Sequence, residues 1–319
     1  YKQLGGEDTI FATESNLLES YGHQVYRYLI NNYQLEEMNS LAISKAVFWN
    51  SKVYQELRTL IRQVKPQVAH FHNTFPLLSP AGYYAAKAEG VPVIQTLHNF
   101  RLLCANGLFF RNGQICEDCL HYKNPLPAII HACYRNNRRV TTAVALTFKF
   151  HSLLDTWSNM IDVFITYSDF AHQKFIQGGL RKEKIKFKTN FLYPEPESGP
   201  GNGGYALFVG RLSPEKGITT LLTAWQKLDT QIPLKIVGDG PLGAQVDREA
   251  ANLPGVEWLG RKPLEEIYQL MGKATCLIIP SEWYETFGRV GIEALAKGTP
   301  LIVTKIGALA ELVQHKYNG

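Results

Sequence analysis

Short apolar runs that alternate with helical segments constrain the fold of this chain most strongly. The runs occupy residues 68–71, 91–97, 163–166, 206–209, 234–237, 276–279 and 301–304. Helical patterns lie between them, at residues 50–64, 218–228, 264–271 and 290–296. Because the runs are nearly continuous, we expect strands that are buried on both faces. Strand–helix alternation of this kind predicts an α/β fold with parallel sheets covered by helices.

The chain has 319 residues, a length that favours two domains over one. Residues 194–204 are rich in proline and glycine and predict the linker between them. We therefore expect an N-terminal domain at residues 1–195 and a C-terminal domain at residues 196–319. We further expect that the first strand of the former and the last helices of the latter are missing.

The formal charge is +5, and all of the excess lies in residues 1–198. This half could face an anionic membrane surface or simply carry a solvated basic face. Residues 136–157 could form an amphipathic helix on a membrane, although an ordinary surface helix is the better interpretation. No apolar run approaches the roughly 18 residues of a spanning helix, and nucleic acid is not expected. We expect a cytoplasmic protein with possible peripheral contact to the inner face of a membrane.

The first motif that carries chemistry follows the run at 206–209. Ser213 and Pro214 predict a helix start, and Arg211 and Lys216 lie beside it. Two cations at the positive end of a helix are unfavourable unless an anion binds there. A diphosphate fits this position, whereas two solvated surface charges are the plainer alternative.

The second motif contains two glutamates, Glu285 and Glu293, on either side of Thr286, Phe287 and Gly288. Gly288 predicts the transition from a loop to a helix. One carboxylate could then lie near a sugar and the other near ribose hydroxyls, while backbone N–H groups point at phosphate oxygens.

The third motif supports a rival interpretation. Residues 238–243 match G-x-G-x-x-G, follow a predicted strand and open a helix, and Glu257 lies where a ribose-binding acid is expected. An NAD-dependent oxidoreductase is therefore an alternative. That alternative gives no role to Arg211 and Lys216. The predicted strand before residues 238–243 is also not the first strand of the C-terminal half, where this fingerprint normally lies.

Taken in order, these motifs resemble family 4 of the retaining GT-B glycosyltransferases over essentially the whole chain. The resemblance rests most specifically on the E-x7-E segment combined with G-R-x4-K-G, and extends to Gly5, Gly6, His98, Gly238 and Gly240. It implies an α/β GT-B fold, in which two Rossmann-like domains hold parallel sheets that face each other across a cleft.

The resemblance also implies site roles. Arg211 and Lys216 would hold the donor diphosphate, Glu293 the nucleotide ribose and Glu285 the transferred sugar. Backbone contacts to sugar and phosphate would come from Thr286, Phe287 and Gly288. Further donor-site contacts would come from Gly5, Gly6, Gly238, Gly240, Arg261 and His98, with His98 approaching the sugar from the opposite domain.

The expected activity is transfer of a hexosyl unit from a nucleoside diphosphate sugar to a saccharide or lipid-linked acceptor, in surface polysaccharide or glycolipid synthesis. Charge neutralisation by Arg211, Lys216 and the helix at Gly288 predicts that catalysis needs no metal cofactor. A sugar-nucleotide epimerase of the same fold and a non-catalytic binding protein are alternatives.

Cysteines cluster in one irregular segment, at Cys104, Cys116, Cys119 and Cys133. The C-x2-C pair at Cys116 and Cys119 favours a structural zinc ion, with disulfides or free thiols as alternatives. Similar inserts occur in a subgroup of bacterial exopolysaccharide glycosyltransferases that this chain resembles.

Two histidines flank Phe71 in the first predicted strand. We expect His70 and His72 to point to opposite faces of the sheet, with His70 packed in the fold and His72 near the predicted cleft.

Overall fold

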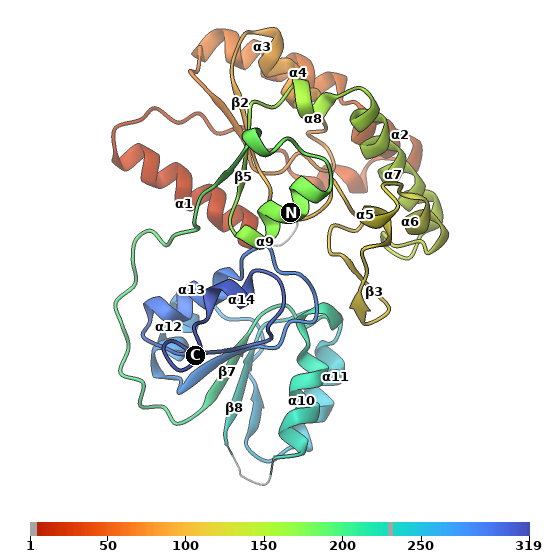
Figure 1. Cartoon of the computed structure of the whole chain (residues 1–319). Helices are drawn as coiled ribbons and strands as arrows, with labels where there is room; N and C mark the ends of the chain where they lie inside the picture. Colours follow the sequence, from red (N-terminus) through yellow and green to blue (C-terminus); the bar gives the residue numbers. More distant parts are fainter. Residues whose placement is uncertain (1–4, 229–231) are drawn as a thin grey trace. The chain divides into compact units, whose positions relative to one another are not determined.

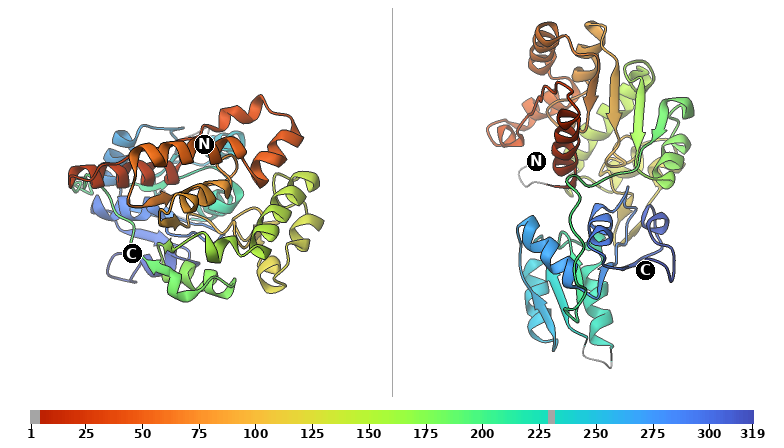
Figure 2. Two further views of the ribbon diagram at one scale, coloured as in Figure 1. Left: turned by 90° about the horizontal axis from the view of Figure 1, so that it is seen from above. Right: turned by 90° about the vertical axis from the view of Figure 1, so that its left-hand side faces the viewer.

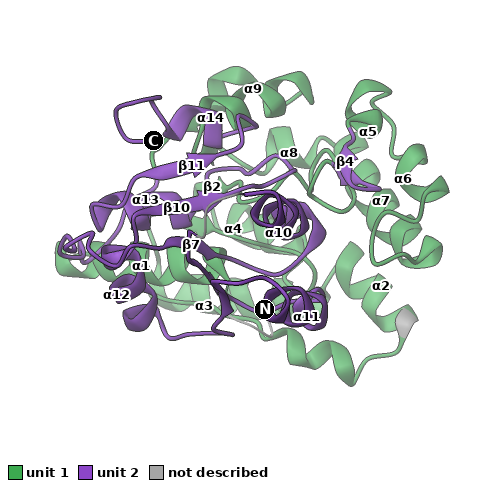
Figure 3. Cartoon of the chain, turned by 90° about the horizontal axis from the view of Figure 1, so that it is seen from below, with its two compact units in different colours: residues 1–109, 117–189 green, residues 110–116, 190–319 purple. Residues whose placement is uncertain are grey.

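The computed structural model describes residues 5–228 and 232–319 and divides the chain into two compact units (Figure 3). Unit 1 is Tyr1–Phe109 with Glu117–Thr189, and unit 2 is Phe110–Cys116 with Asn190–Gly319. Each unit has its own parallel sheet (Figure 1), which confirms the prediction of two Rossmann-like α/β domains. The domain boundary at residue 195 stays a prediction.

Unit 1 carries a four-stranded sheet in the order β1-β2-β5-β6, with all neighbours parallel. Its strands are β1 (Ala69–Phe71), β2 (Val93–Thr96), β5 (Val163–Thr166) and β6 (Ile185–Phe187). Its helices are α1 (Gly6–Ser20), η1 (Asn32–Glu36), α2 (Ser40–Phe48), α3 (Ser51–Val64), α4 (Ala81–Ala88), α5 (Asp118–His121), α6 (Leu126–Ile130), α7 (Arg138–Leu153), α8 (Thr156–Asn159), α9 (Asp169–Gln177) and η2 (Lys182–Lys184).

Unit 2 carries a five-stranded parallel sheet in the order β11-β10-β7-β8-β9. Its strands are β7 (Ala206–Val209), β8 (Leu234–Val237), β9 (Val256–Trp258), β10 (Cys276–Ile279) and β11 (Leu301–Val303), and a short hairpin adds β3 (Phe110–Arg111) and β4 (Gln114–Ile115). Its helices are η3 (Pro214–Lys216), α10 (Ile218–Gln226), α11 (Gly243–Ala251), α12 (Leu264–Lys273), α13 (Arg289–Ala296) and α14 (Leu309–Leu312).

Helices lie on both faces of the sheet in unit 2 (Figure 2), and alternate residues of its central strands pack against opposite layers. From β7, Leu207 packs with residues of α12, α13 and α14, whereas Phe208 packs with residues of α10 and α11. Burial on both faces explains why these strands read as continuous apolar runs.

Besides the short hairpin of β3 and β4, two strands were not predicted, and both lie at edges of the parallel sheets. β6 ends the unit 1 sheet and β9 ends the unit 2 sheet. Their middle residues, Lys186 and Glu257, are exposed, so neither segment reads as a continuous apolar run. Edge strands commonly carry charged side chains, which limit pairing with other chains.

The segment predicted as a linker is partly fixed to unit 2. The N–H groups of Gly199, Gly201 and Gly203 donate to carbonyl oxygens of unit 2 at 2.7–2.9 Å. An added Cβ at Gly199 would lie 2.2 Å from the backbone of Gly272, so a larger residue does not fit there. Lys297 Nζ also donates to the carbonyl oxygen of Glu197, so the contacts of this segment with the rest of unit 2 begin before Gly199.

Candidate functional site

The residues of unit 2 that best fit a binding site lie in the loops after β7 and β10. Between these two neighbouring strands, the direction in which the chain adds strands to the sheet reverses. In the chain, β8 and β9 extend the sheet from one side of β7, whereas β10 and β11 extend it from the other. The helices after the two strands lie on opposite faces, since α10 packs in one apolar cluster and α13 in the other. Open α/β sheets bind their ligands beyond the carboxyl ends of strands at such a switch point.

An ion pair joins the loops that follow β7 and β10. Lys216 Nζ lies 2.5 Å from Glu285 Oε1 and 5.0 Å from the centroid of the Trp283 ring. The same oxygen accepts hydrogen bonds from Ser281 Oγ and Trp283 Nε1, each at 3.0 Å. Glu285 is only 8% exposed, so these contacts hold its carboxylate in one orientation. Among the described residues, Oε2 has no hydrogen bond and is not fully buried, which leaves it available to a ligand.

Glycines bring the loops of this edge into direct backbone contact. An added Cβ at Gly217, whose φ is +69°, would lie 1.9 Å from Pro280 O. An added Cβ at Gly238 would lie 1.9 Å from Gly210 O, and one at Gly240 would lie 2.4 Å from Leu212 O. The glycines of the G-x-G-x-x-G segment therefore serve loop packing, and a role for Gly238 and Gly240 in ligand binding stays a prediction.

Positive groups at this edge are available to an anion. Arg211 is exposed and has no side-chain hydrogen bond or ion pair within the described part of the chain. Gly288 (φ +87°) is the N-cap residue of α13 and provides no side-chain cap, so the first N–H groups of the helix lack that partner. Thr286 and Phe287 lie half-buried in the loop just before it. A helix N-terminus, an arginine and a lysine together favour phosphate or diphosphate.

Glu293 lies on α13 and is 8% exposed. Its Oε1 accepts a hydrogen bond from Arg289 Nε at 2.9 Å, while Arg289 Nη1 is buried and has no hydrogen-bond partner among the residues that the structure describes. Burial raises the pKa of Glu293, and Arg289 only partly offsets this. An unpaired buried donor beside a desolvated carboxylate indicates a binding position. Arg289 was not selected from the sequence, although it lies inside the E-x7-E segment.

Arg261 follows β9, which is separated from β7 by β8. Its side chain is exposed and has no hydrogen bond or ion pair to another described side chain. The N–H of Gly238 donates to the carbonyl oxygen of Gly260 at 2.9 Å, which joins the loop before Arg261 to the loop that follows β8. The contact of Arg261 with a nucleotide base stays a prediction.

In unit 1, a carboxylate joins α1 to the ends of β1 and β2. Glu7 Oε2 accepts from Asn73 Nδ2 at 2.7 Å, and Glu7 Oε1 accepts from Asn99 Nδ2 at 3.0 Å. Gly5 precedes α1 and its N–H donates to Asp8 Oδ2, while a Cβ on Gly6 would meet no atom within 4 Å. Sequence reasoning missed Glu7; its only signal was an acidic residue in the first turn of a helix.

His98 belongs to a row of imidazoles in unit 1. His98 Nε2 lies 3.1 Å from His72 Nδ1, and the two rings are stacked with centroids 5.3 Å apart. The expectation that His70 and His72 point to opposite faces was wrong, since their ring centroids lie 4.4 Å apart. Residues at i and i+2 of a strand share a face, and here that face is covered by α1.

Burial keeps these imidazoles neutral. Desolvation lowers the pKa of His70 to about 4 and that of His72 to about 2. It also lowers the pKa of His98, against the opposing effect of Glu7. The site edge of unit 1 therefore presents uncharged nitrogens and amides, which suit hydroxyl-rich ligands better than a diphosphate.

The four cysteines of the predicted zinc site are divided between the two units. Cys116 belongs to unit 2 and the other three to unit 1. Cys119 and Cys133 pack in an apolar cluster around Val144. Cys104 is buried, its thiol donates to the side chain of Asn106 at 3.0 Å, and burial raises its pKa, which disfavours the thiolate that zinc requires. No three of these sulfurs gather into a metal-sized group among the described residues, so the zinc stays a prediction.

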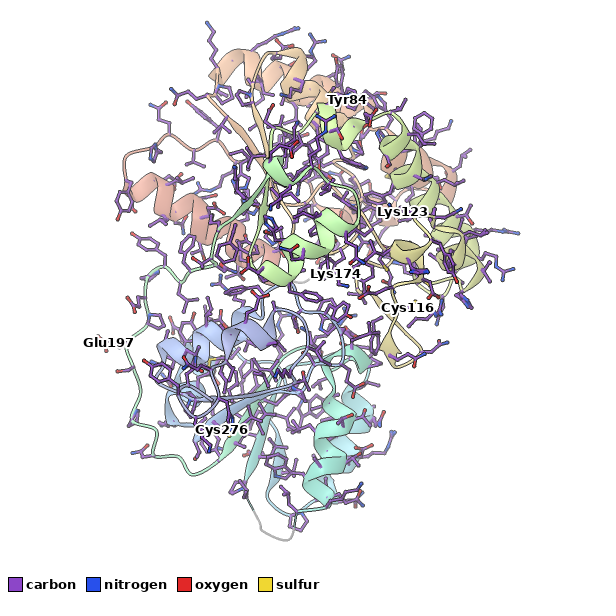
Figure 4. The ribbon with its side chains drawn as sticks, in the orientation of Figure 1. Tyr84, Cys116, Lys123, Lys174, Glu197 and Cys276 are labelled. Carbon is purple, nitrogen blue, oxygen red and sulfur yellow. The ribbon has the colours of Figure 1, made fainter. Side chains whose placement is uncertain are left out.

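The fifth cysteine lies elsewhere. Cys276 is the first residue of β10 in unit 2 (Figure 4) and packs at the apolar cluster of α10 and α11.

The chain is similar to several known proteins. Residues 193–319 match the family model described as glycosyl transferases group 1. An uncharacterised glycosyltransferase of Methanocaldococcus jannaschii is 37% identical over 146 residues, which are 45% of this chain and 37% of the relative. An uncharacterised 42.6 kDa protein from the cps region of Klebsiella pneumoniae is 24% identical over 276 residues, covering 83% of this chain and 64% of the relative.

Among solved structures, Anabaena HepE in complex with UDP-glucose superposes with a TM-score of 0.64 and 20% identity, covering 100% of this chain and 82% of that one. At this identity the likeness concerns the fold, and it confirms the prediction of a GT-B architecture. The chain spans between 37% and 64% of the length of these two curated relatives. Among the described helices, none is both long and apolar enough to cross a bilayer.

Proposed function

We propose that this chain, whose residues 193–319 belong to the glycosyl transferases group 1 family, transfers a hexosyl unit from a nucleoside diphosphate sugar to a saccharide or lipid-linked acceptor. The reaction retains the anomeric configuration and serves surface polysaccharide or glycolipid synthesis. Solved HepE binds UDP-glucose, which makes a uridine diphosphate hexose the first donor to test here.

The observation that carries the proposal is the arrangement of the loops after β7 and β10. Lys216 lies against Glu285, and α13, whose start has no side-chain cap, begins four residues after Glu285. A donor diphosphate would take Lys216, Arg211 and the N–H groups of α13 as its partners. Glu285 Oε2 would accept a hydrogen bond from a hydroxyl of the transferred sugar.

The remaining predicted residues would complete the donor site. Glu293 and Arg289 Nη1 would bind the nucleotide ribose, and Arg261 the base. Backbone groups of Thr286, Phe287 and Gly288 would contact sugar and phosphate. From unit 1, His98 would orient the sugar, and the chain at Gly5 and Gly6 would leave room for donor and acceptor.

The chemistry follows from the charges. The bond between the anomeric carbon and the phosphate oxygen breaks, and a bond to an acceptor hydroxyl oxygen forms on the same face of the sugar. The departing diphosphate takes the proton of that hydroxyl. Lys216, Arg211 and the N-terminus of α13 stabilise the negative charge that grows on the leaving group.

A peripheral membrane surface would bring a lipid-linked acceptor near the enzyme. On α7, residues 139, 146, 150 and 153 share one helical face, where Leu146 is 54% and Leu153 is 70% exposed. Residues 119–154 contain no Asp or Glu but several basic residues, among them Lys123 near α5–α7 (Figure 4). Exposed leucines among uncompensated cations are typical of a surface that rests on anionic lipid.

Vesicle sedimentation tests this surface. The doubly substituted Leu146→Ser, Leu153→Ser chain should bind anionic phospholipid vesicles roughly tenfold less well than the parent, with unchanged thermal stability. The matched control is Leu264→Ser in unit 2, where the leucine is 46% exposed on α12. Equal binding by all three proteins would contradict a membrane role for α7.

Release of nucleoside diphosphate tests the enzymatic proposal. The chain is incubated with a panel of uridine, guanosine and adenosine diphosphate sugars, with and without a crude lipid and saccharide acceptor fraction. We expect acceptor-stimulated release from one donor, and its loss in Glu285→Ala. Release that does not depend on acceptor would favour a hydrolase, and conversion of the donor to an isomeric sugar nucleotide without release would favour an epimerase. Thermal stabilisation by NAD alone would favour an oxidoreductase.

A further inference from the structure

Three potential metal ligands converge on one face of β1 in unit 1. Glu14 lies on α1, and His70 and His72 lie at i and i+2 of the strand segment that α1 covers. His70 Nδ1 is 3.9 Å from Glu14 Oε1, and His72 Nε2 is 3.6 Å from Glu14 Oε2. The ligand atoms of the three residues all lie within 4.8 Å of one another.

The opposite nitrogen of each imidazole already has a partner. His70 Nε2 lies 2.7 Å from Thr96 Oγ1, and His72 Nδ1 lies 3.1 Å from His98 Nε2. These contacts orient both rings so that the remaining nitrogens face Glu14. Metal-bound histidines show the same pattern, in which the nitrogen away from the metal is held by a second group.

One carboxylate oxygen in this group is left without a hydrogen bond. Glu14 Oε2 is fully buried and has no hydrogen-bond partner among the described residues. Burying an unsatisfied anionic oxygen is costly, and such groups are rare in folded proteins. A bound cation would remove this cost.

The cluster is reached from a cavity. A cavity of about 590 Å³ in unit 1 is lined by Glu14, His70 and His72 together with residues of α1 and α3. An ion can therefore approach the three ligands without unfolding of the sheet.

We propose that Glu14, His70 and His72 form a binding site for a divalent transition-metal ion of the zinc type. Zinc binds histidine nitrogen and carboxylate oxygen at roughly 2.0–2.2 Å, which places tetrahedral ligands about 3.3–3.5 Å apart. The separations of 3.6 and 3.9 Å, which involve different oxygens of Glu14, exceed this value by a few tenths of an ångström. The three ligand atoms all lie within 4.8 Å of one another, so the two imidazoles and the carboxylate must also move closer together when one ion binds. Nitrogen and oxygen ligands in this ratio suit zinc, cobalt or nickel better than magnesium or calcium.

Lys188 is the competitor for this site. Its ammonium contacts Glu14 Oε1, the oxygen that faces His70. A bound metal ion and this ammonium repel each other, so the lysine must move aside when the ion binds. Removal of Lys188 should therefore strengthen metal binding, which a merely structural ion pair would not predict.

The bound ion would fasten α1 to β1. The same helix carries Glu7, which holds Asn73 and Asn99 at the ends of β1 and β2. Metal binding would thus stabilise the polar edge of unit 1 and is independent of nucleotide binding in unit 2.

Calorimetric titration of the metal-free chain with Zn²⁺ and with Co²⁺ tests the proposal. We expect one ion per chain, with affinity lowered at least tenfold in Glu14→Gln and in His72→Asn and raised in Lys188→Met. Loss of one ligand should remove at least as much affinity as loss of an outer-shell partner, which costs roughly 10- to 100-fold. The exposed His23→Asn serves as the control and should bind like the parent.

The cysteine segment is the rival metal site and needs its own variant. The proposal requires that the doubly substituted Cys116→Ser, Cys119→Ser chain still binds the ion. It also requires a Co²⁺ spectrum that lacks thiolate charge-transfer absorption. Binding lost in the cysteine variant but kept in His72→Asn would overturn the assignment, as would the absence of saturable binding. If Glu14→Gln and His72→Asn fail to fold, the Lys188→Met affinity and the Co²⁺ spectrum decide alone.

Discussion

The polar edges of the two units are built for different partners, although both lie at the carboxyl ends of parallel strands. In unit 2, Arg211 and the start of α13 lack side-chain partners within the described structure, and Lys216 has a single carboxylate neighbour. In unit 1, Glu7 holds two asparagines and the buried histidines are neutral. The comparison indicates that unit 2 is prepared for an anion, whereas unit 1 offers neutral hydrogen-bonding groups.

The largest expected effect concerns the cations of unit 2. Lys216→Ala should lower turnover of the donor about 10²- to 10³-fold, because one preorganised group that stabilises the leaving diphosphate is removed. Steady-state kinetics with the active donor gives the ratio. The exposed Lys227→Ala, on the turn after α10, should behave like the parent. A Lys216→Ala enzyme with full kcat/KM would remove the basis for treating this edge as a diphosphate site.

Next in size is the packing of the loops by glycine. Gly217→Ala should destabilise the protein by about 1–3 kcal/mol, since it combines a strained positive φ with overpacking. The added Cβ would lie 1.9 Å from Pro280 O. Gly201→Ala is the matched control, because its φ is +64° but nothing lies within 4 Å of the added atom. Chemical denaturation should show a larger loss of unfolding free energy for Gly217→Ala than for Gly201→Ala. Equal losses would contradict the close contact between Gly217 and Pro280.

A comparable but functionally separate effect is expected in unit 1. Glu7→Ala leaves the amides of Asn73 and Asn99 without this acceptor, which should cost about 1–3 kcal/mol of unfolding free energy. Affinity for a nucleoside diphosphate should not change. The exposed Glu37→Ala controls for loss of negative charge. A loss of nucleotide affinity in Glu7→Ala equal to that in Lys216→Ala would abolish the distinction between the two edges.

The smallest expected effect depends on pH. Burial raises the pKa of Glu293 above its ordinary 4.5, so the folded protein holds this proton more tightly than the unfolded chain. As pH rises from 4.5 through the pKa that Glu293 has in the folded protein, ionisation of this carboxyl group therefore lowers the free energy of unfolding. Glu293→Gln should gain stability over the parent above that window and show no gain below it, while nucleotide binding weakens. Thermal unfolding of both proteins from pH 4 to pH 8 measures their difference in stability below and above this window. If Glu293→Gln were more stable than the parent only at acid pH, the raised pKa of Glu293 would be contradicted.

Much of the unit 2 edge was predictable, because residues that are neighbours in the sequence mark each of its strands and turns. The runs before Gly210 and Pro280 are buried on both faces and therefore easy to identify, and glycine with proline marks the turns that follow. The unit 1 edge was not, since the contacts of Glu7 and Glu14 join residues more than 50 positions apart. Only the packing of α1 on β1 brings them together.

The most direct test of this account is calorimetric binding of uridine diphosphate to three proteins: the parent chain, Lys216→Ala and Glu7→Ala. The account predicts one site in the parent, affinity weakened at least about tenfold in Lys216→Ala because a charge-assisted contact is lost, and no change in Glu7→Ala. Equal affinity of the parent and Lys216→Ala would contradict the placement of the diphosphate between the loops that follow β7 and β10.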